Sequence, residues 1–108
     1  MPREITVQEL ARMQAAGESL MLLDVRQPEE HAHAAIPGSV LIPMNELPSR
    51  WQTIDVPDDV PLILYCHHGI RSWHAATYLE QCGLPDVRSL ADGIDAWSLH
   101  VDGNVARY

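Results

Sequence analysis

Short apolar runs alternate with helix-like segments along this chain. Residues 20–25 and 61–65 are almost wholly apolar. Such runs are typical of strands that are buried on both faces of a sheet. Shorter segments at 40–42, stopped by Pro43, and at 87–90 predict two further strands. The pattern therefore predicts buried strands spread along the whole chain.

Helices are predicted between these strands, and the first is the best marked. Thr6 and Glu9 can form a capping box, in which each side chain accepts a hydrogen bond from the other residue's backbone N–H. Gly17 can end that helix. The other predicted helices cover residues 28–33, 45–51, 72–81 and 94–100. Because strands alternate with helices, the predicted fold is α/β, a three-layer arrangement with a central parallel sheet of about five strands and helices on both faces.

The segment 62–72 carries the candidate chemistry. An apolar strand leads into Cys66, a short loop with Gly69 and Arg71 follows, and a helix is expected to begin at Ser72. Backbone N–H groups in such a loop and at a helix start converge on what lies before them. They favour the thiolate of a cysteine placed there, which makes it a nucleophile. A buried, inert cysteine would explain neither the glycine nor the arginine.

The spacing of Cys66 and Arg71 separates two kinds of cysteine chemistry. The two residues form a C-x4-R motif. Cysteine phosphatases use C-x5-R, whose longer loop wraps the three terminal oxygens of a phosphate. A loop that is one residue shorter is better suited to a single large sulfur atom on the cysteine. A phosphatase or arsenate reductase is therefore the less favoured interpretation.

This loop resembles the active-site loop of the rhodanese family of sulfurtransferases. Residues 22–26, followed by Glu30 and residues 36–39, are similar to the family's first signature, and residues 93–97 are similar to its closing one. The three motifs occur in the family's order and span nearly the whole chain. Two positions depart from the family pattern. Alanines at 34 and 35 replace a common Gly-His pair, and Asp92 replaces the first of two glycines.

The resemblance implies a single rhodanese-like domain over residues 1–108, with Cys66 as the catalytic nucleophile. Cys66 would take a sulfane sulfur from thiosulfate or a persulfide and pass it to cyanide, a thiol or a carrier protein. The substrate-binding residues would be His67, His68, Gly69, Ile70, Arg71 and Ser72, and Arg71 could instead brace the loop carbonyls. Neither a cofactor nor a metal is expected. A sulfur-relay module that acts mainly through protein contacts remains the alternative, because the loop and residues 93–97 also resemble the rhodanese domain of some adenylyltransferases.

Three further residues could support or modify this chemistry. Asp24 and Arg26 are predicted at the carboxyl end of their strand, where they either form an ion pair that braces the strand end or reach the substrate. Cys82 could resolve an intermediate on Cys66, but a helix of ten residues between them spans about 15 Å. A disulfide needs Cα atoms within about 7 Å. Cys82 is therefore predicted to be a packing thiol.

The charge balance limits the partners of this chain. Fifteen acidic residues against seven arginines and no lysine give a formal net charge of −8. Such a surface is a poor match for nucleic acid or anionic lipid, so neither is expected as a partner. The predicted partners are a small anionic sulfur donor, captured locally by loop amides and Arg71, and a thiol or sulfur-carrier protein as acceptor.

Composition also predicts the compartment. The 108 residues, 46% of them hydrophobic, suit one soluble domain. No basic N-terminal region precedes an apolar run, and no apolar stretch is long enough to span a bilayer. Because a reactive thiol needs a reducing environment and two cysteines do not make a disulfide framework, we expect a cytoplasmic protein.

Overall fold

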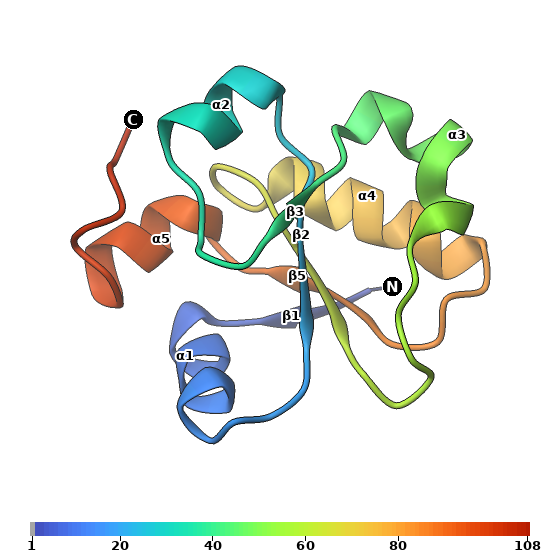
Figure 1. Cartoon of the computed structure of the whole chain (residues 1–108), viewed down its shortest axis with the longest axis horizontal. Coiled ribbons are helices and arrows are strands. Elements are labelled where there is room, and N and C mark those ends of the chain that lie inside the picture. The colour runs from blue at the N-terminus through green and yellow to red at the C-terminus, as the bar shows by residue number, and fades with distance from the viewer. Residues whose placement is uncertain (1) are drawn as a thin grey trace.

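Five parallel strands form one sheet in the order β1-β5-β4-β2-β3 (Figure 1). This arrangement comes from a computed structural model that describes residues 2–108, so Met1 of the predicted domain lies outside the described residues. The strands are β1 (Arg3–Ile5), β2 (Met21–Asp24), β3 (Val40–Leu41), β4 (Leu62–Tyr65) and β5 (Val87–Leu90). The predicted α/β fold with a five-stranded parallel sheet is confirmed.

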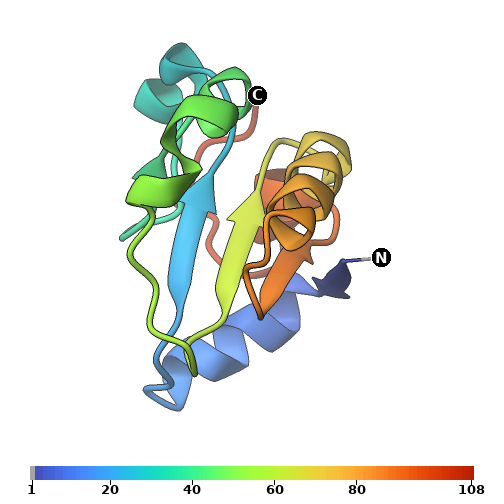
Figure 2. The same cartoon turned by 90° about the vertical axis from the view of Figure 1, so that its right-hand side faces the viewer.

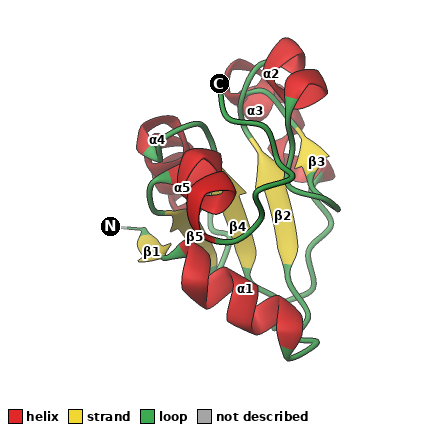
Figure 3. Cartoon of the chain, turned by 90° about the vertical axis from the view of Figure 1, so that its left-hand side faces the viewer, coloured by secondary structure: helices red, strands yellow, loops and turns green. Residues whose placement is uncertain are grey.

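Helices cover both faces of this sheet. They are α1 (Val7–Ala15), α2 (Pro28–His33), α3 (Leu47–Arg50), α4 (Ile70–Gln81) and α5 (Gly93–His100), with single 3₁₀ turns at Met44–Glu46 and Trp51–Thr53. Figure 3 shows α1 and α5 on one face, and Figure 2, from the opposite side, shows α3 and α4 on the other. In Figure 2, α2 and the end of the chain lie beyond the arrowhead of β2, at the carboxyl edge of the sheet.

Strand β4 is buried on both faces of the sheet, which explains its continuous run of apolar residues. All four of its residues are at most 1% exposed. Because successive side chains of a strand point to opposite faces, Leu62 and Leu64 enter the core under α3 and α4, whereas Ile63 and Tyr65 enter the core under α1 and α5. Each fully buried large apolar side chain contributes about 1.5–3 kcal/mol. The two cores therefore hold β4 rigidly at the centre of the sheet.

The first strand was not identified from the sequence. Arg3 and Glu4 of β1 are exposed, and Ile5 is buried. The strand lies at the edge of the sheet and pairs with β5, Ile5 opposite Leu90. A strand of three residues with one buried side chain has no local pattern that separates it from a loop.

No helix within the described residues has the length and apolar character that crossing a bilayer requires.

A buried ion pair closes the carboxyl end of β2. Asp24 and Arg26 have fully buried side chains, and the guanidinium donates from Nε to Oδ1 at 2.8 Å and from Nη2 to Oδ2 at 2.7 Å. The backbone N–H of Arg26 also donates to Oδ1, at 3.0 Å, and Nη2 donates to the carbonyl of Ala34, at 2.6 Å. The structure thus places the two residues as a brace between the strand end and the segment that follows α2.

Removing the charge of Asp24 should destabilise the fold strongly. Asp24→Asn leaves Arg26 as a buried cation without a counter-ion, so we expect a loss of about 3–5 kcal/mol in the free energy of unfolding. Urea denaturation measures this loss. Asp58→Asn, at an exposed loop position, is the matched control and should change stability by less than about 0.5 kcal/mol. Equal effects of the two substitutions would contradict the bracing role.

Candidate active site

Cys66 directly follows β4 at the carboxyl edge of the sheet, and its sulfur is the centre of the loop. The residue is 1% exposed. Its Sγ accepts hydrogen bonds from the backbone N–H of Gly69 at 3.1 Å and of Ser72 at 3.3 Å. Both donors belong to the start of α4, where the helix dipole adds partial positive charge. This geometry stabilises negative charge on the sulfur.

Helix α4 begins at Ile70, so the prediction that it starts at Ser72 is wrong. The N-cap is Gly69, with φ +102°. A side chain there would be strained, and its Cβ would lie 3.1 Å from the backbone N of Asp92. Ser72 lies instead in the first turn, where its Oγ donates to the carbonyl of Gly69 at 3.2 Å and lies 2.8 Å from Ser89 Oγ. Its hydroxyl ties the loop to β5.

The start of α5 holds the other side of the loop. The backbone N–H of Ile94 donates to the carbonyl of Cys66 at 2.9 Å, and that of Asp95 donates to the carbonyl of His67 at 3.1 Å. These carbonyls are therefore engaged by α5, while the N–H groups of Gly69 and Ser72 are directed at the sulfur. The close contact requires glycine at 93, because a Cβ would lie 2.4 Å from the Cys66 carbonyl oxygen.

Asp92, the departure from the two-glycine pattern, takes a left-handed conformation. Its φ is +60°, and it is the positive-φ residue other than glycine among the described residues. Aspartate and asparagine tolerate this conformation better than other side chains do. The substitution therefore leaves the entry into α5 intact.

Arg71 does not lie free at the edge of the loop. Its guanidinium forms a two-pronged ion pair with Glu30, Nη1 to Oε1 at 2.8 Å and Nη2 to Oε2 at 2.9 Å. Glu30 Oε1 also accepts from the backbone N–H of Gln27, and Oε2 accepts from the Tyr108 hydroxyl at 2.7 Å. The hydrogen bond from Arg71 is the main reason that the pKa of Glu30 falls to about 2. Arg71 thus links the loop to α2.

The two loop histidines lie in an aromatic stack. The His67 ring stacks on Tyr108, with centroids 3.9 Å apart, and on His68, 4.0 Å apart. Burial, and then the neighbouring His68, lower the pKa of His67, which favours its neutral form. His68 points outward, with its side chain 60% exposed and Nδ1 4.0 Å from Asp95. Within residues 2–108, no three histidine, cysteine or acidic side chains converge as metal ligands would.

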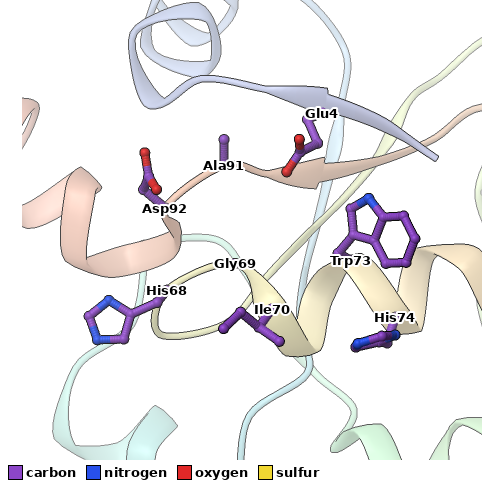
Figure 4. A pocket seen from close by; sticks show the side chains of 8 residues that line it. All are labelled: Glu4, His68, Gly69, Ile70, Trp73, His74, Ala91 and Asp92. Carbon is purple, nitrogen blue, oxygen red and sulfur yellow. The ribbon is translucent and has the colours of Figure 1, made fainter. Parts of the chain in front are cut away.

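Two hollows meet at the loop. One, of about 300 Å³, is lined by Cys66, His67, His68, Ile70 and Arg71. The second, of about 410 Å³, runs beside it over Trp73 and the strand end at Ala91, and shares His68 and Ile70 with the first (Figure 4). Ile70 is 70% exposed between them. The structure thus brings the predicted loop residues together, whereas Asp24 and Arg26 do not line either hollow.

Cys82 lies far along α4 from Cys66. It is the C-cap of the twelve-residue helix whose first turn donates to Cys66, and both thiols are free.

Two residues of the site were not among the predicted ones. Glu30 lay within the first motif but had no assigned role, and Tyr108, 78 positions away from it, had no sequence signal at all.

Comparison with known proteins defines the class. Residues 6–100 match the Rhodanese-like domain family, and the chain belongs to this family. It is 37% identical over 100 residues to a sulfurtransferase of Allochromatium vinosum, covering 93% of this chain and 92% of that protein. It is 34% identical to the probable adenylyltransferase/sulfurtransferase MoeZ of Mycobacterium tuberculosis, but covers 26% of it. A rhodanese-related protein from Thermoplasma volcanium superposes with a TM-score of 0.81 at 30% identity, covering 92% of this chain and 93% of that one. The family and these relatives support sulfurtransferase activity in general.

Adding a methyl group at position 93 should disturb the loop. Gly93→Ala places a Cβ 2.4 Å from the Cys66 carbonyl oxygen at a backbone φ of +61°. We expect a loss of stability of about 2–4 kcal/mol and slower alkylation of Cys66. Gly103→Ala, where a Cβ meets no atom within 4 Å, is the control and should change neither. Native-like stability and alkylation of the Gly93 variant would contradict the contact.

Proposed function

We propose that this protein is a sulfurtransferase that carries a sulfane sulfur on Cys66 between a donor, such as thiosulfate or a persulfide, and a thiophilic acceptor. The observation that carries the proposal is the Cys66 sulfur held by two backbone N–H groups at the start of α4. A sulfur so placed is a nucleophile before transfer and a good leaving group after it. The acceptor is cyanide in an assay and a thiol or a carrier protein in the cell.

Transfer takes two displacements at sulfur. In the first, the Cys66 thiolate attacks the outer sulfur of the donor, a new S–S bond forms, and the donor's S–S bond breaks with its electron pair leaving on sulfite or a thiolate. In the second, the acceptor attacks the outer sulfur and the Cys66 thiolate leaves. The covalent persulfide divides one difficult transfer into two easier steps, and no external oxidant or reductant is needed.

Two backbone N–H groups stabilise the charge on the sulfur in this mechanism. The N–H groups of Gly69 and Ser72 hold negative charge on Cys66 Sγ at the start and the end of the cycle. Asp24 and Arg26 support the strand end from within. The remaining proposed substrate-binding residues line the hollow above the sulfur: His67, His68, Ile70 and Arg71.

A sulfur-relay role is the second candidate. The exposed Ile70 beside the sulfur offers an apolar contact for a protein acceptor. The names of several relatives point the same way: MoeZ, the adenylyltransferase and sulfurtransferase uba4 of Ogataea parapolymorpha, and the putative sulfur carrier protein YrkF of Bacillus subtilis. Rates of transfer to a small thiol and to a persulfide-accepting protein, measured from one donor, separate the two roles.

Replacing the nucleophile should abolish transfer and leave the fold intact. In Cys66→Ser the hydroxyl is not ionised at neutral pH and cannot carry a persulfide. Mass spectrometry of the wild-type protein after incubation with a sulfane-sulfur donor should find one added sulfur atom on Cys66. Cys82→Ser is the matched control and should keep full activity. Full activity with an unmodified Cys66, or inactivity of the Cys82 variant, would sink the mechanism.

Phosphate esters should be poor substrates. The four residues between Cys66 and Arg71 leave one N–H fewer than a phosphate-wrapping loop has, and Arg71 is paired with Glu30. We expect only trace turnover of p-nitrophenyl phosphate and phosphotyrosine peptides. Release of p-nitrophenol measures the first, and release of inorganic phosphate measures the second. Turnover comparable to sulfur transfer would show that the loop length does not discriminate between the two chemistries.

A further inference from the structure

The arginine on the wall of the Cys66 hollow has a carboxylate as its partner. Of the five lining residues, Arg71 alone carries a permanent charge. Both of its terminal nitrogens donate to Glu30, at 2.8 and 2.9 Å. A guanidinium that faces a carboxylate with both nitrogens has its charge balanced over the few ångströms that matter for a bound ligand. The cation that an anionic donor would need is therefore already paired with Glu30.

Glu30 is itself held in place. Each of its oxygens accepts a second hydrogen bond, Oε1 from the backbone N–H of Gln27 and Oε2 from the hydroxyl of Tyr108. The same hydroxyl accepts from Nη1 of Arg26 at 2.7 Å, and Arg26 is anchored by Asp24 in the core. A carboxylate fixed by four donors cannot swing aside at little cost when a substrate arrives. Its lowered pKa keeps it ionised throughout the neutral range.

The remaining charges around the loop do not supply a free cation. Arg107 donates to Asp95 at 3.0 Å, and the groove next to the hollow adds Glu4 and Asp92. Around the loop, the ion pairs and the groove lining described above bring together three arginines and five carboxylates, namely Arg26, Arg71 and Arg107 against Glu4, Asp24, Glu30, Asp92 and Asp95. A dianion approaching the thiolate therefore finds Arg71 already paired with Glu30, and the N–H groups of Gly69 and Ser72 already donating to that thiolate.

We propose that the site prefers sulfane-sulfur donors of low negative charge, organic persulfides above all, over the dianion thiosulfate, and that Glu30 sets this preference by balancing Arg71. The inference rests on the proposed sulfurtransferase function and names its donor class. With a protonated persulfide RS–SH, a bond forms between Cys66 Sγ and the outer sulfur, the S–S bond breaks, the electron pair leaves on RS⁻, and the proton stays on the transferred sulfur. With thiosulfate, two negative charges must come within bonding distance of a third, and this repulsion grows with the donor's charge.

Glu30→Gln tests the preference, because it removes the charge while keeping the length of the side chain and an oxygen that can accept from Arg71. The donors are thiosulfate, with two charges, and an arenethiosulfonate, with one, both assayed with cyanide as acceptor. We expect the ratio of kcat/KM for thiosulfate to that for the thiosulfonate to rise on the order of tenfold in this variant. Glu18→Gln, an exposed position just before β2 and so at the opposite edge of the sheet, changes the net charge equally and should leave the ratio unchanged.

The outcomes distinguish the donor preference from the sulfurtransferase function on which it rests. An unchanged or lower ratio in Glu30→Gln, with Cys66 still loaded with sulfur, overturns the donor preference and leaves the sulfurtransferase function standing. Failure of both donors to load Cys66 in the wild-type protein overturns the function itself. If Glu30→Gln does not fold, the wild-type salt dependence decides. As the Debye length falls from about 30 Å to about 8 Å, kcat/KM should rise more for thiosulfate than for the thiosulfonate, and a steeper fall for thiosulfate would overturn the proposal.

Discussion

The site depends on how the backbone of residues 66–72 is held between two helix starts. At the start of α4, the N–H groups of Gly69 and Ser72 point at the Cys66 sulfur. At the start of α5, the N–H groups of Ile94 and Asp95 hold the carbonyls of Cys66 and His67. Two glycines permit this contact, Gly69 by its left-handed turn and Gly93 by its lack of a Cβ. Strand β4, buried in both cores, fixes the position from which the loop begins. The Cys66 sulfur thus owes its environment to the backbone, and the side chains around it adjust the charge.

That adjustment runs through one connected set of polar contacts. The Asp24–Arg26 pair in the core anchors Tyr108, whose hydroxyl donates to Glu30, and Glu30 holds Arg71 on the rim of the site. In the proposed mechanism, the same contacts that brace the carboxyl end of β2 therefore set the charge that a donor encounters. A stability element and a specificity element share residues here, which explains why Arg71 braces the loop and still faces the hollow.

Local patterns were enough to predict the parts of the structure that local forces determine. The apolar strand before Cys66, the capping box of Thr6 and Glu9 and the alternation of strands and helices all follow from short-range rules. The helix start at Ile70 was missed because Gly69 can cap a helix in a left-handed conformation that the sequence does not reveal. The partners of Arg71 could not be predicted from the residues alone, since Glu30 and Tyr108 come from distant segments that the folded sheet brings together.

The most direct test of the central claim is a crystal structure of the protein after incubation with a sulfane-sulfur donor. The account predicts one additional atom bonded to Cys66 Sγ at an S–S length of about 2.05 Å, inside the hollow lined by His67, His68, Ile70 and Arg71. Gly69 and Ser72 should still direct their N–H groups at the sulfur pair. An additional atom on Cys82, or an unmodified Cys66 in protein that has been shown to transfer sulfur, would contradict the account.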